Sequence, residues 1–166
     1  MKCAFSGHRA ERFPWSKENE MGCVRLKERL RQEILRAFEE GYRYFLVGGA
    51  TGVDTWAGEL VLELKQDGYP VALEVAIPFP NHRATLKEEW RERFDALCQN
   101  ADAVVVVSEH VPIKAAYHIR NSYLVAEAQR LIAVYDEMSD LKGGTYSTLQ
   151  KAKKAGLSVV QINWVE

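Results

Sequence analysis

The feature that most constrains the fold is a stretch in which a short apolar run stops at two glycines and a helical pattern follows. Phe45-Leu46-Val47 leads into Gly48-Gly49-Ala50-Thr51-Gly52-Val53-Asp54, and residues 51–66 then place apolar side chains at helical spacing. Glycine lets a ligand approach the backbone without an intervening Cβ, and a helix start presents free N–H groups to an anion. The stretch predicts a phosphate-binding turn. The alternative is that its glycines only permit a tight connection between strand and helix.

The same alternation of strand and helix patterns continues along the chain. Apolar runs at residues 2–5, 42–47, 71–77, 103–107, 131–135 and 158–163 predict strands, and periodic segments at 20–40, 51–66, 81–99, 116–129 and 145–155 predict helices. The run 103–107 is almost pure valine, as expected when both faces of a parallel strand are covered. The pattern predicts one α/β domain over residues 1–166, with three layers and a mainly parallel sheet flanked by helices.

Composition sets further bounds on function. The 166 residues are 47% hydrophobic and 27% charged, as in an ordinary globular domain, and the formal net charge of −1 gives no overall reason to expect a polyanionic partner. The three cysteines have no metal-ligand spacing and no even count for a disulfide framework, so no metal site is predicted. The N-terminus lacks a signal-peptide pattern and no apolar run reaches about 20 residues, which predicts a cytoplasmic protein without a membrane span.

In open parallel sheets, ligands bind beyond the carboxyl ends of the strands, and this chain places glycine-rich and polar segments at those ends. Backbone N–H groups and hydroxyls at helix starts can bind phosphate, and Arg9, Arg83 and Arg120 can form forked bonds to phosphate or carboxylate. The predicted ligand-binding residues are Ser6, Gly7, His8, Arg9, Gly48, Gly49, Ala50, Thr51, Gly52, Asp54, Arg120, Asn121, Gly143, Gly144 and Thr145.

Several side chains have two interpretations. Asp54 lies in the first turn of its helix, where it either caps free N–H groups or binds a ribose hydroxyl. His8 is either an acid–base group or a hydrogen-bonded loop residue. His82 and His118 are interpreted as polar surface or loop residues. The tryptophans are interpreted as packing residues, with Trp15 the best candidate for covering a ligand. Neither a Walker-type motif nor G-x-G-x-x-G is present.

Four motifs together resemble those of YpsA-like proteins of the SLOG superfamily, in the same order over nearly the whole chain. They are Ser6-Gly7-His8-Arg9, Gly48-Gly49-Ala50-Thr51-Gly52-Val53-Asp54, Ile119-Arg120-Asn121 and Lys142-Gly143-Gly144-Thr145. The superfamily also includes the DNA-processing protein DprA and the LOG cytokinin-activating phosphoribohydrolases. The resemblance implies a Rossmann-like fold whose glycine motifs line a site for a nucleotide or nucleotide-derived ligand. It implies little about a reaction.

The departures from these relatives rank the functions. LOG hydrolases carry a P-G-G-x-G-T-x-x-E motif whose glutamate acts in N-glycosidic cleavage, but residues 142–151 contain no glutamate and Lys151 stands near the expected position. The same segment and Arg120-Asn121 are more similar to DprA. DprA-like DNA binding draws on positive charge that contacts phosphates, however, and this chain has no basic run.

The sequence therefore predicts a module that binds a nucleotide-type small molecule, such as an ADP-ribose- or NAD-like compound, in a regulatory or sensing role. One alternative is a hydrolase acting on an N-glycosidic or phosphoester bond of such a ligand, with His8, Asp54 and Glu127 as acid–base candidates. Another is a DprA-like binder of single-stranded DNA. No cofactor or catalytic residue is assigned. Large apolar residues on the helices leave homo-oligomerisation open.

Overall fold

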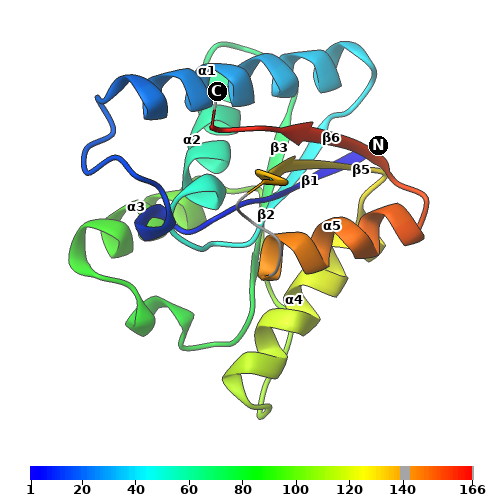
Figure 1. Ribbon diagram of the computed structural model, residues 1–166. Helices are drawn as coiled ribbons and strands as arrows, with labels where there is room; N and C mark the ends of the chain where they lie inside the picture. The colour runs from blue at the N-terminus through cyan, green and yellow to red at the C-terminus, as the bar shows by residue number, and fades with distance from the viewer. Residues whose placement is uncertain (139–142, 166) are drawn as a thin grey trace.

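The computed structural model describes residues 1–138 and 143–165, so Lys142 of the last glycine motif lies outside the described residues. Strands and helices alternate along the chain, as predicted (Figure 1). The strands are β1 (Lys2–Ser6), β2 (Tyr44–Val47), β3 (Ala72–Ile77), β4 (Ala103–Val106), β5 (Arg130–Val134) and β6 (Ser158–Ile162). The helices are η1 (Ala10–Arg12), α1 (Met21–Glu39), α2 (Val53–Gln66), η2 (His82–Thr85), α3 (Glu88–Asn100), α4 (Ile113–Glu127) and α5 (Gly144–Lys154), where η marks a 3-10 helix.

The described strands form one six-stranded sheet in the order β4-β3-β2-β1-β5-β6, and all neighbouring pairs are parallel. The predicted α/β fold is confirmed. The chain winds outward from β1 through β2 and β3 to β4, then returns to the other side of β1 to form β5 and β6. The winding direction therefore reverses between β1 and β5. In sheets of this kind a ligand crevice forms beyond the carboxyl ends of the strands at the reversal point.

Each face of the sheet packs against its own group of helices (Figure 1). Cys3 and Phe5 of β1 point into the core shared with α1, α2 and α3, whereas Ala4 between them points into the core shared with α4 and α5. The second core contains Ala76 and Ala133 from neighbouring strands, and such small side chains let a helix approach the sheet closely. The strict alternation follows from the period of two in a strand.

The expectation that both faces of the valine strand are covered is wrong. Val104 is 44% exposed and Val106 is 42% exposed. Among the described strands β4 lies at the edge of the sheet and pairs with β3 alone, while α3 packs against α2 and η2. A run of valines suits an edge strand as well as a central one, because β-branched residues favour extended backbone in both places.

The helix predicted over residues 81–99 is divided. Its first part is the 3-10 helix η2, and α3 begins only at Glu88. Leu86 between them has an extended backbone (φ −92°, ψ 143°) and a buried side chain. The Thr85 hydroxyl donates to the carbonyl oxygen of His82 at 2.7 Å, a local bond that competes with helix continuation. Helix α4, in contrast, begins at Ile113, three residues before the predicted start.

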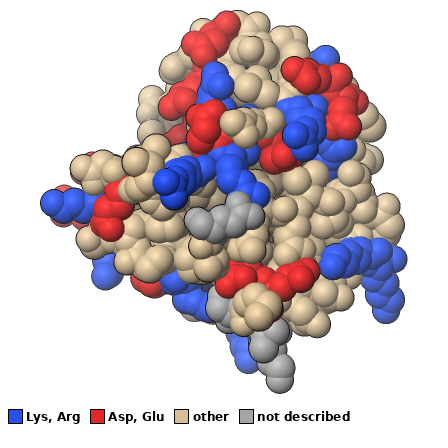
Figure 2. Space-filling view, turned by 45° about the horizontal axis from the view of Figure 1, so that its top comes forward, with Lys and Arg blue, Asp and Glu red and all other residues tan. Residues whose placement is uncertain are grey.

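The charges on one face of the molecule are mixed in sign. On the face shown in Figure 2, Lys and Arg side chains lie among Asp and Glu side chains rather than in one field of a single sign. Within the described ranges, no helix combines the length and apolar character needed to cross a membrane.

Candidate functional site

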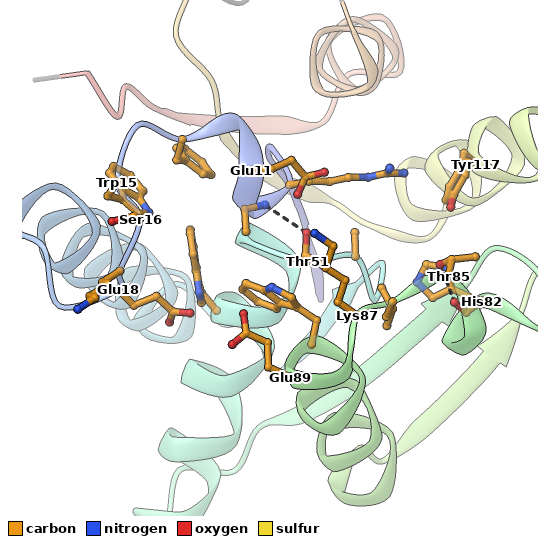
Figure 3. Close-up of a pocket in the computed structure, with 18 residues that line it drawn as sticks. Glu11, Trp15, Ser16, Glu18, Thr51, His82, Thr85, Lys87, Glu89 and Tyr117 are labelled. Atoms are coloured by element: carbon orange, nitrogen blue, oxygen red, sulfur yellow. Dashed lines mark hydrogen bonds between the residues drawn. The ribbon is translucent and has the colours of Figure 1, made fainter.

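Two adjoining cavities lie at the carboxyl edge of the sheet. The glycine cavity has a volume of about 710 Å³ and lies between the segment after β1, helix α4 and the start of α5; its lining includes Ser6, His8, Arg120, Asn121, Gly143 and Gly144. The aromatic cavity has a volume of about 790 Å³ and lies between residues 9–18, the start of α2 and the η2–α3 segment; its lining includes Phe13, Trp15, Thr51, Trp56, His82 and Trp90 (Figure 3). Arg9, Glu11, Ala50 and Tyr117 line both.

The fold brings most of the predicted ligand-binding residues to these cavities. Ser6, Gly7, His8, Arg9, Ala50, Asp54, Arg120, Asn121, Gly143, Gly144 and Thr145 line the glycine cavity, and Thr51 lines the aromatic cavity. Gly48, Gly49 and Gly52 line neither one. Segments separated by more than a hundred residues in the sequence thus meet at one edge, as the parallel topology requires.

Two glycines of the turn make room for protein atoms. An ideal Cβ on Gly48 would lie 2.5 Å from Nη1 of Arg120 and 2.8 Å from Oδ2 of Asp54. Gly52 has a positive φ of 77°, and a Cβ there would lie 2.6 Å from the carbonyl oxygen of His8. Both glycines are required by packing within the chain.

Buried charges hold the glycine turn in place. Asp54 Oδ2 accepts a hydrogen bond from the Ala50 N–H at 3.2 Å, so its carboxylate fixes the turn that precedes its own helix. Arg120 donates through Nη1 to the carbonyl oxygen of Gly48 and through Nε to Oδ1 of Asn121 at 2.9 Å. Burial raises the pKa of Asp54 and lowers that of Arg120, while the attraction between the two charges opposes both shifts.

The glycine cavity is the more positive of the two. Among its described lining residues, Arg9, Arg12, Lys114 and Arg120 face two acidic residues, Glu11 and Asp54, whereas the aromatic cavity has Lys or Arg at three positions and Glu at three. The Arg9 guanidinium carbon lies 5.0 Å from the centre of the Tyr117 ring, and that of Arg120 lies 5.7 Å from the same ring. Tyr117 thus holds two cations at the boundary between the cavities.

The start of α5 contributes open backbone to the glycine cavity. An ideal Cβ on Gly144 would meet no described atom within 4 Å, although this residue lines the cavity. The buried Thr145 follows it, and the first N–H groups of a helix have no acceptor within the helix. This geometry suits an anion close to the backbone.

The interpretation of His82 as a surface or loop residue is wrong. Its side chain is 2% exposed, and Nε2 lies 3.1 Å from the carbonyl oxygen of Gly49. Because a carbonyl only accepts, Nε2 carries the proton and the neutral ring leaves Nδ1 as an acceptor. Burial lowers the pKa of His82, which favours this neutral form. The sequence placed His82 at the correct edge, but nothing in its neighbours indicated the contact with Gly49.

Three other charged residues considered from the sequence lie away from both cavities. Arg83 forms a forked pair of bonds with Asp95, at 2.7 and 2.9 Å. Glu127 accepts from Lys2 at 3.2 Å, where β1 begins, which is the opposite end of the sheet. Lys151 donates to the Ser122 hydroxyl at 3.0 Å.

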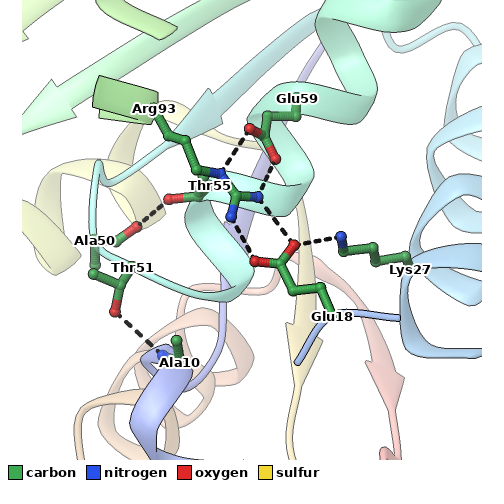
Figure 4. Close-up of polar contacts among 8 residues, drawn as sticks. All are labelled: Ala10, Glu18, Lys27, Ala50, Thr51, Thr55, Glu59 and Arg93. Carbon is green, nitrogen blue, oxygen red and sulfur yellow. Dashed lines mark hydrogen bonds and ion pairs between the residues drawn. The ribbon is translucent and has the colours of Figure 1, made fainter. Parts of the chain in front are cut away.

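A charged network fixes the wall of the aromatic cavity (Figure 4). Glu18, in the segment after η1, lies 2.5 Å from Arg93 of α3 and 2.5 Å from Lys27 of α1. Arg93 also donates to Glu59 of α2 at 2.6 Å. Burial alone would raise the pKa of Glu18, but hydrogen bonds from Arg93 and Lys27 lower it to about 2. The guanidinium of Arg93 therefore joins the segment before α1 to the two helices α2 and α3.

Replacing Glu18 with glutamine is expected to lower the free energy of unfolding at neutral pH by about 1 kcal/mol, since the pair is partly exposed and screened by solvent. The pKa of Glu18 falls from the ordinary 4.5 to about 2 in the folded protein. The contribution of ionised Glu18 to the free energy of unfolding is therefore complete above about pH 4.5 and is lost as the pH falls toward 2. Urea unfolding from pH 7 to pH 2.5 measures this.

The control is Glu63→Gln at an exposed position of α2. This variant is expected to follow the wild type at every pH. The difference between wild type and Glu18→Gln should shrink below pH 4.5, and a difference that stays constant across this range would contradict the assignment.

The comparisons with known proteins agree with this architecture. The model of the YpsA SLOG family matches residues 3–165. A UPF0398 protein of Halalkalibacterium halodurans is 32% identical over 151 residues, covering 90% of this chain and 78% of the relative. A UPF0398 protein of Brevibacillus brevis is 30% identical over 161 residues, covering 95% and 84%.

A solved structure of DNA processing protein A from Helicobacter pylori has a similar fold, with a TM-score of 0.65 and 20% identity. The match covers 97% of this chain and 64% of that protein, so the chain spans less than two thirds of its length. The family match extends over nearly all of the chain, and the four motifs lie within it. The protein belongs to the YpsA SLOG family.

Proposed function

We propose that the protein binds a nucleotide-type small molecule, an ADP-ribose- or NAD-like compound, with a phosphate group in the glycine cavity and a regulatory or sensing role. The observation that carries the proposal is the positive glycine cavity at the reversal point of the sheet, whose lining includes Arg9 and the open backbone of Gly144. A forked guanidinium and free N–H groups at a helix start are the two common ways in which proteins hold phosphate.

A binding role is better supported than hydrolysis. Asp54 is buried and its Oδ2 already accepts the Ala50 N–H, so its carboxylate serves the turn. Glu127 lies at the far end of the sheet beside Lys2. Of the three acid–base candidates, Asp54 and His8 line the glycine cavity, and both carboxylates accept hydrogen bonds from other residues of the protein. Chromatography of a bound nucleotide after overnight incubation separates the two roles, since binding alone leaves the compound unchanged.

Calorimetric titration tests the proposal. The titrants are ADP-ribose, NAD, ADP, AMP, ribose 5-phosphate and pyrophosphate. Wild type is expected to bind at least one of them, and Arg9→Ala is expected to weaken that binding about tenfold or more, because one charge-assisted contact to phosphate is lost. Arg36→Ala is the matched control, since this exposed arginine of α1 carries the same charge and is paired with Glu33. If wild type binds no phosphate compound, the proposal fails.

A second candidate is single-stranded DNA, the partner that is named for the Helicobacter pylori protein of similar fold. The specific feature in its favour is a basic cavity next to an aromatic one, since backbone charge and base stacking are combined in single-strand binding sites. The mixed surface charges in Figure 2 favour the small molecule instead. A DNA binder would retain a (dT)20 oligonucleotide at low salt in gel shifts and lose it steeply as salt is added.

A further inference from the structure

We propose that the aromatic cavity receives the heteroaromatic ring of the ligand, so that one nucleotide-type molecule spans both cavities with its phosphate in the glycine cavity and its base beside the tryptophans. The inference rests on the proposed function and deepens it by assigning the base site. It starts from the continuity of the two spaces, because Arg9, Glu11, Ala50 and Tyr117 line both. Each volume lies within the 300–1,000 Å³ that is typical of small-molecule sites.

At its Trp15 end, the aromatic cavity is lined by stacked aromatic rings. Figure 3 shows Trp15 and Glu18 at one end of the cavity and Tyr117 and His82 at the other, with Thr51 between them. The Phe13 and Trp15 rings stack with centres 4.7 Å apart and an angle of 8° between their planes. The centre of the Trp56 ring lies 5.6 Å from that of Phe13 and 6.3 Å from that of Trp15. Rings held this firmly offer a planar ligand contact area at little cost in side-chain entropy.

Trp90 supplies an aromatic surface from α3. The guanidinium carbon of Arg93 lies 4.6 Å from the centre of the Trp90 ring. The same Arg93 is held by Glu18 and Glu59, so the network in Figure 4 sets the position of this tryptophan relative to the 13–18 segment. Trp90 is therefore the residue best placed to stack on a base without itself belonging to the buried core.

Unused polar atoms in the same lining favour a ring with hydrogen-bonding edges over a purely apolar group. Within the described part of the chain, Trp56 Nε1 and His82 Nδ1 are both buried and neither has a hydrogen-bond partner. Trp56 Nε1 is a donor, and His82 Nδ1 is an acceptor because Nε2 faces the Gly49 carbonyl oxygen. Buried polar atoms are rarely left unpaired, and a nucleobase beside the tryptophans offers an acceptor to Trp56 Nε1. His82 Nδ1 lies at the opposite, Tyr117 end of the cavity and faces another part of the ligand.

The charges that line the two cavities indicate which group of the ligand each cavity receives. The glycine cavity has an excess of Lys and Arg, whereas the aromatic cavity is balanced by Glu11, Glu18 and Glu89. A phosphate is therefore favoured at the glycine end and a neutral base at the tryptophan end. Arg9 and Tyr117, which meet at the boundary, are placed beside the part of the ligand that joins the two groups.

Titration of the full chain tests the inference through its own tryptophans. Trp15, Trp56 and Trp90 line the cavity and Trp164 lies 6.1 Å from Trp15, so a bound base is expected to change the intrinsic fluorescence. The probes are ADP-ribose, ADP, adenosine and ribose 5-phosphate. The base-containing phosphates are expected to bind at least tenfold more tightly than ribose 5-phosphate, in line with the energy of one base stack.

The decisive variants are Trp90→Ala and Trp90→Phe, with Tyr146→Ala as a control at an exposed position of α5. Trp90→Ala is expected to weaken ADP-ribose or ADP binding about tenfold or more and to leave ribose 5-phosphate binding unchanged. Trp90→Phe is expected to retain most of the wild-type affinity for ADP-ribose or ADP. Calorimetry follows the variants, since they lack one fluorophore.

The outcomes separate this inference from the proposed function. If ribose 5-phosphate binds as tightly as ADP, or if Trp90→Ala weakens both equally, the base site is wrong while phosphate binding stands. If no phosphate compound binds to the wild type, the proposed function fails and the base site fails with it. A Trp90→Ala protein that does not fold leaves the wild-type comparison of ADP with ribose 5-phosphate, together with Trp90→Phe, to decide.

Discussion

Replacing Arg120 with alanine is expected to lower the free energy of unfolding by about 3–5 kcal/mol. The side chain is 6% exposed, and its guanidinium donates to the Gly48 carbonyl oxygen and to Asn121. Truncation leaves that carbonyl oxygen without its donor and removes the cation that attracts the buried Asp54 carboxylate most strongly. Urea unfolding followed by circular dichroism measures the loss.

The loss should depend on pH in a defined direction. Burial already raises the pKa of Asp54 above the ordinary 3.8, and removal of Arg120 takes away the attraction that opposes this shift. A carboxyl whose pKa is higher in the folded state takes up its proton more readily there, so folding becomes more favourable as the pH falls through the range between the two pKa values. The deficit of Arg120→Ala is therefore expected to be smaller at pH 5 than at pH 7.

Arg9→Ala is the matched control for this experiment. Arg9 is exposed and lies over the same Tyr117 ring, so its removal is expected to change the free energy of unfolding by no more than about 0.5 kcal/mol. A loss below about 1 kcal/mol for Arg120→Ala, or equal losses for the two variants, would show that the buried arginine does not hold the glycine turn.

Local pattern was enough to predict the elements around the glycine turn. The strand ending at Val47 and a helix over residues 51–66, which the structure begins at Val53, follow from apolar spacing within one window of sequence. The carboxyl-edge cluster also follows, since parallel topology places the segments after β1, β2 and β5 together whatever their distance in sequence. Edge and centre positions in the sheet are set by pairing between distant strands, and for that reason the exposure of Val104 and Val106 was not predictable from a valine run.

Local sequence pattern does not show which distant residues a given side chain contacts in the folded protein. Gly48 contacts Arg120, 72 positions away, and His82 contacts the carbonyl oxygen of Gly49, 33 positions away. A glycine that makes room for an arginine and one that makes room for a ligand look alike in a sequence. The proposed base site depends on Trp90 and the 13–18 segment, which are far apart in sequence and are linked by the ion pair between Glu18 and Arg93.

Substituting two glycines separates packing from ligand approach. Gly48→Ala is expected to lower the free energy of unfolding by about 1–3 kcal/mol, because its Cβ must displace the buried groups of Arg120 and Asp54 that would lie 2.5 and 2.8 Å away. Gly144→Ala is expected to leave the free energy of unfolding unchanged or slightly higher. Its Cβ meets no described atom within 4 Å, and alanine favours a helix more than glycine does. Urea unfolding of both variants measures the contrast.

For ligand binding we expect the opposite result, with a large effect of the substitution at Gly144. A methyl group there meets no described atom within 4 Å and lies at the cavity lining, so it would displace a phosphate held by the first N–H groups of α5. We therefore expect Gly144→Ala to weaken nucleotide binding about tenfold or more. If Gly144→Ala bound nucleotide like the wild type while remaining fully stable, the phosphate would have to lie nearer Ser6 and Arg9 than α5. The pair of alanine variants therefore locates the anion within the glycine cavity.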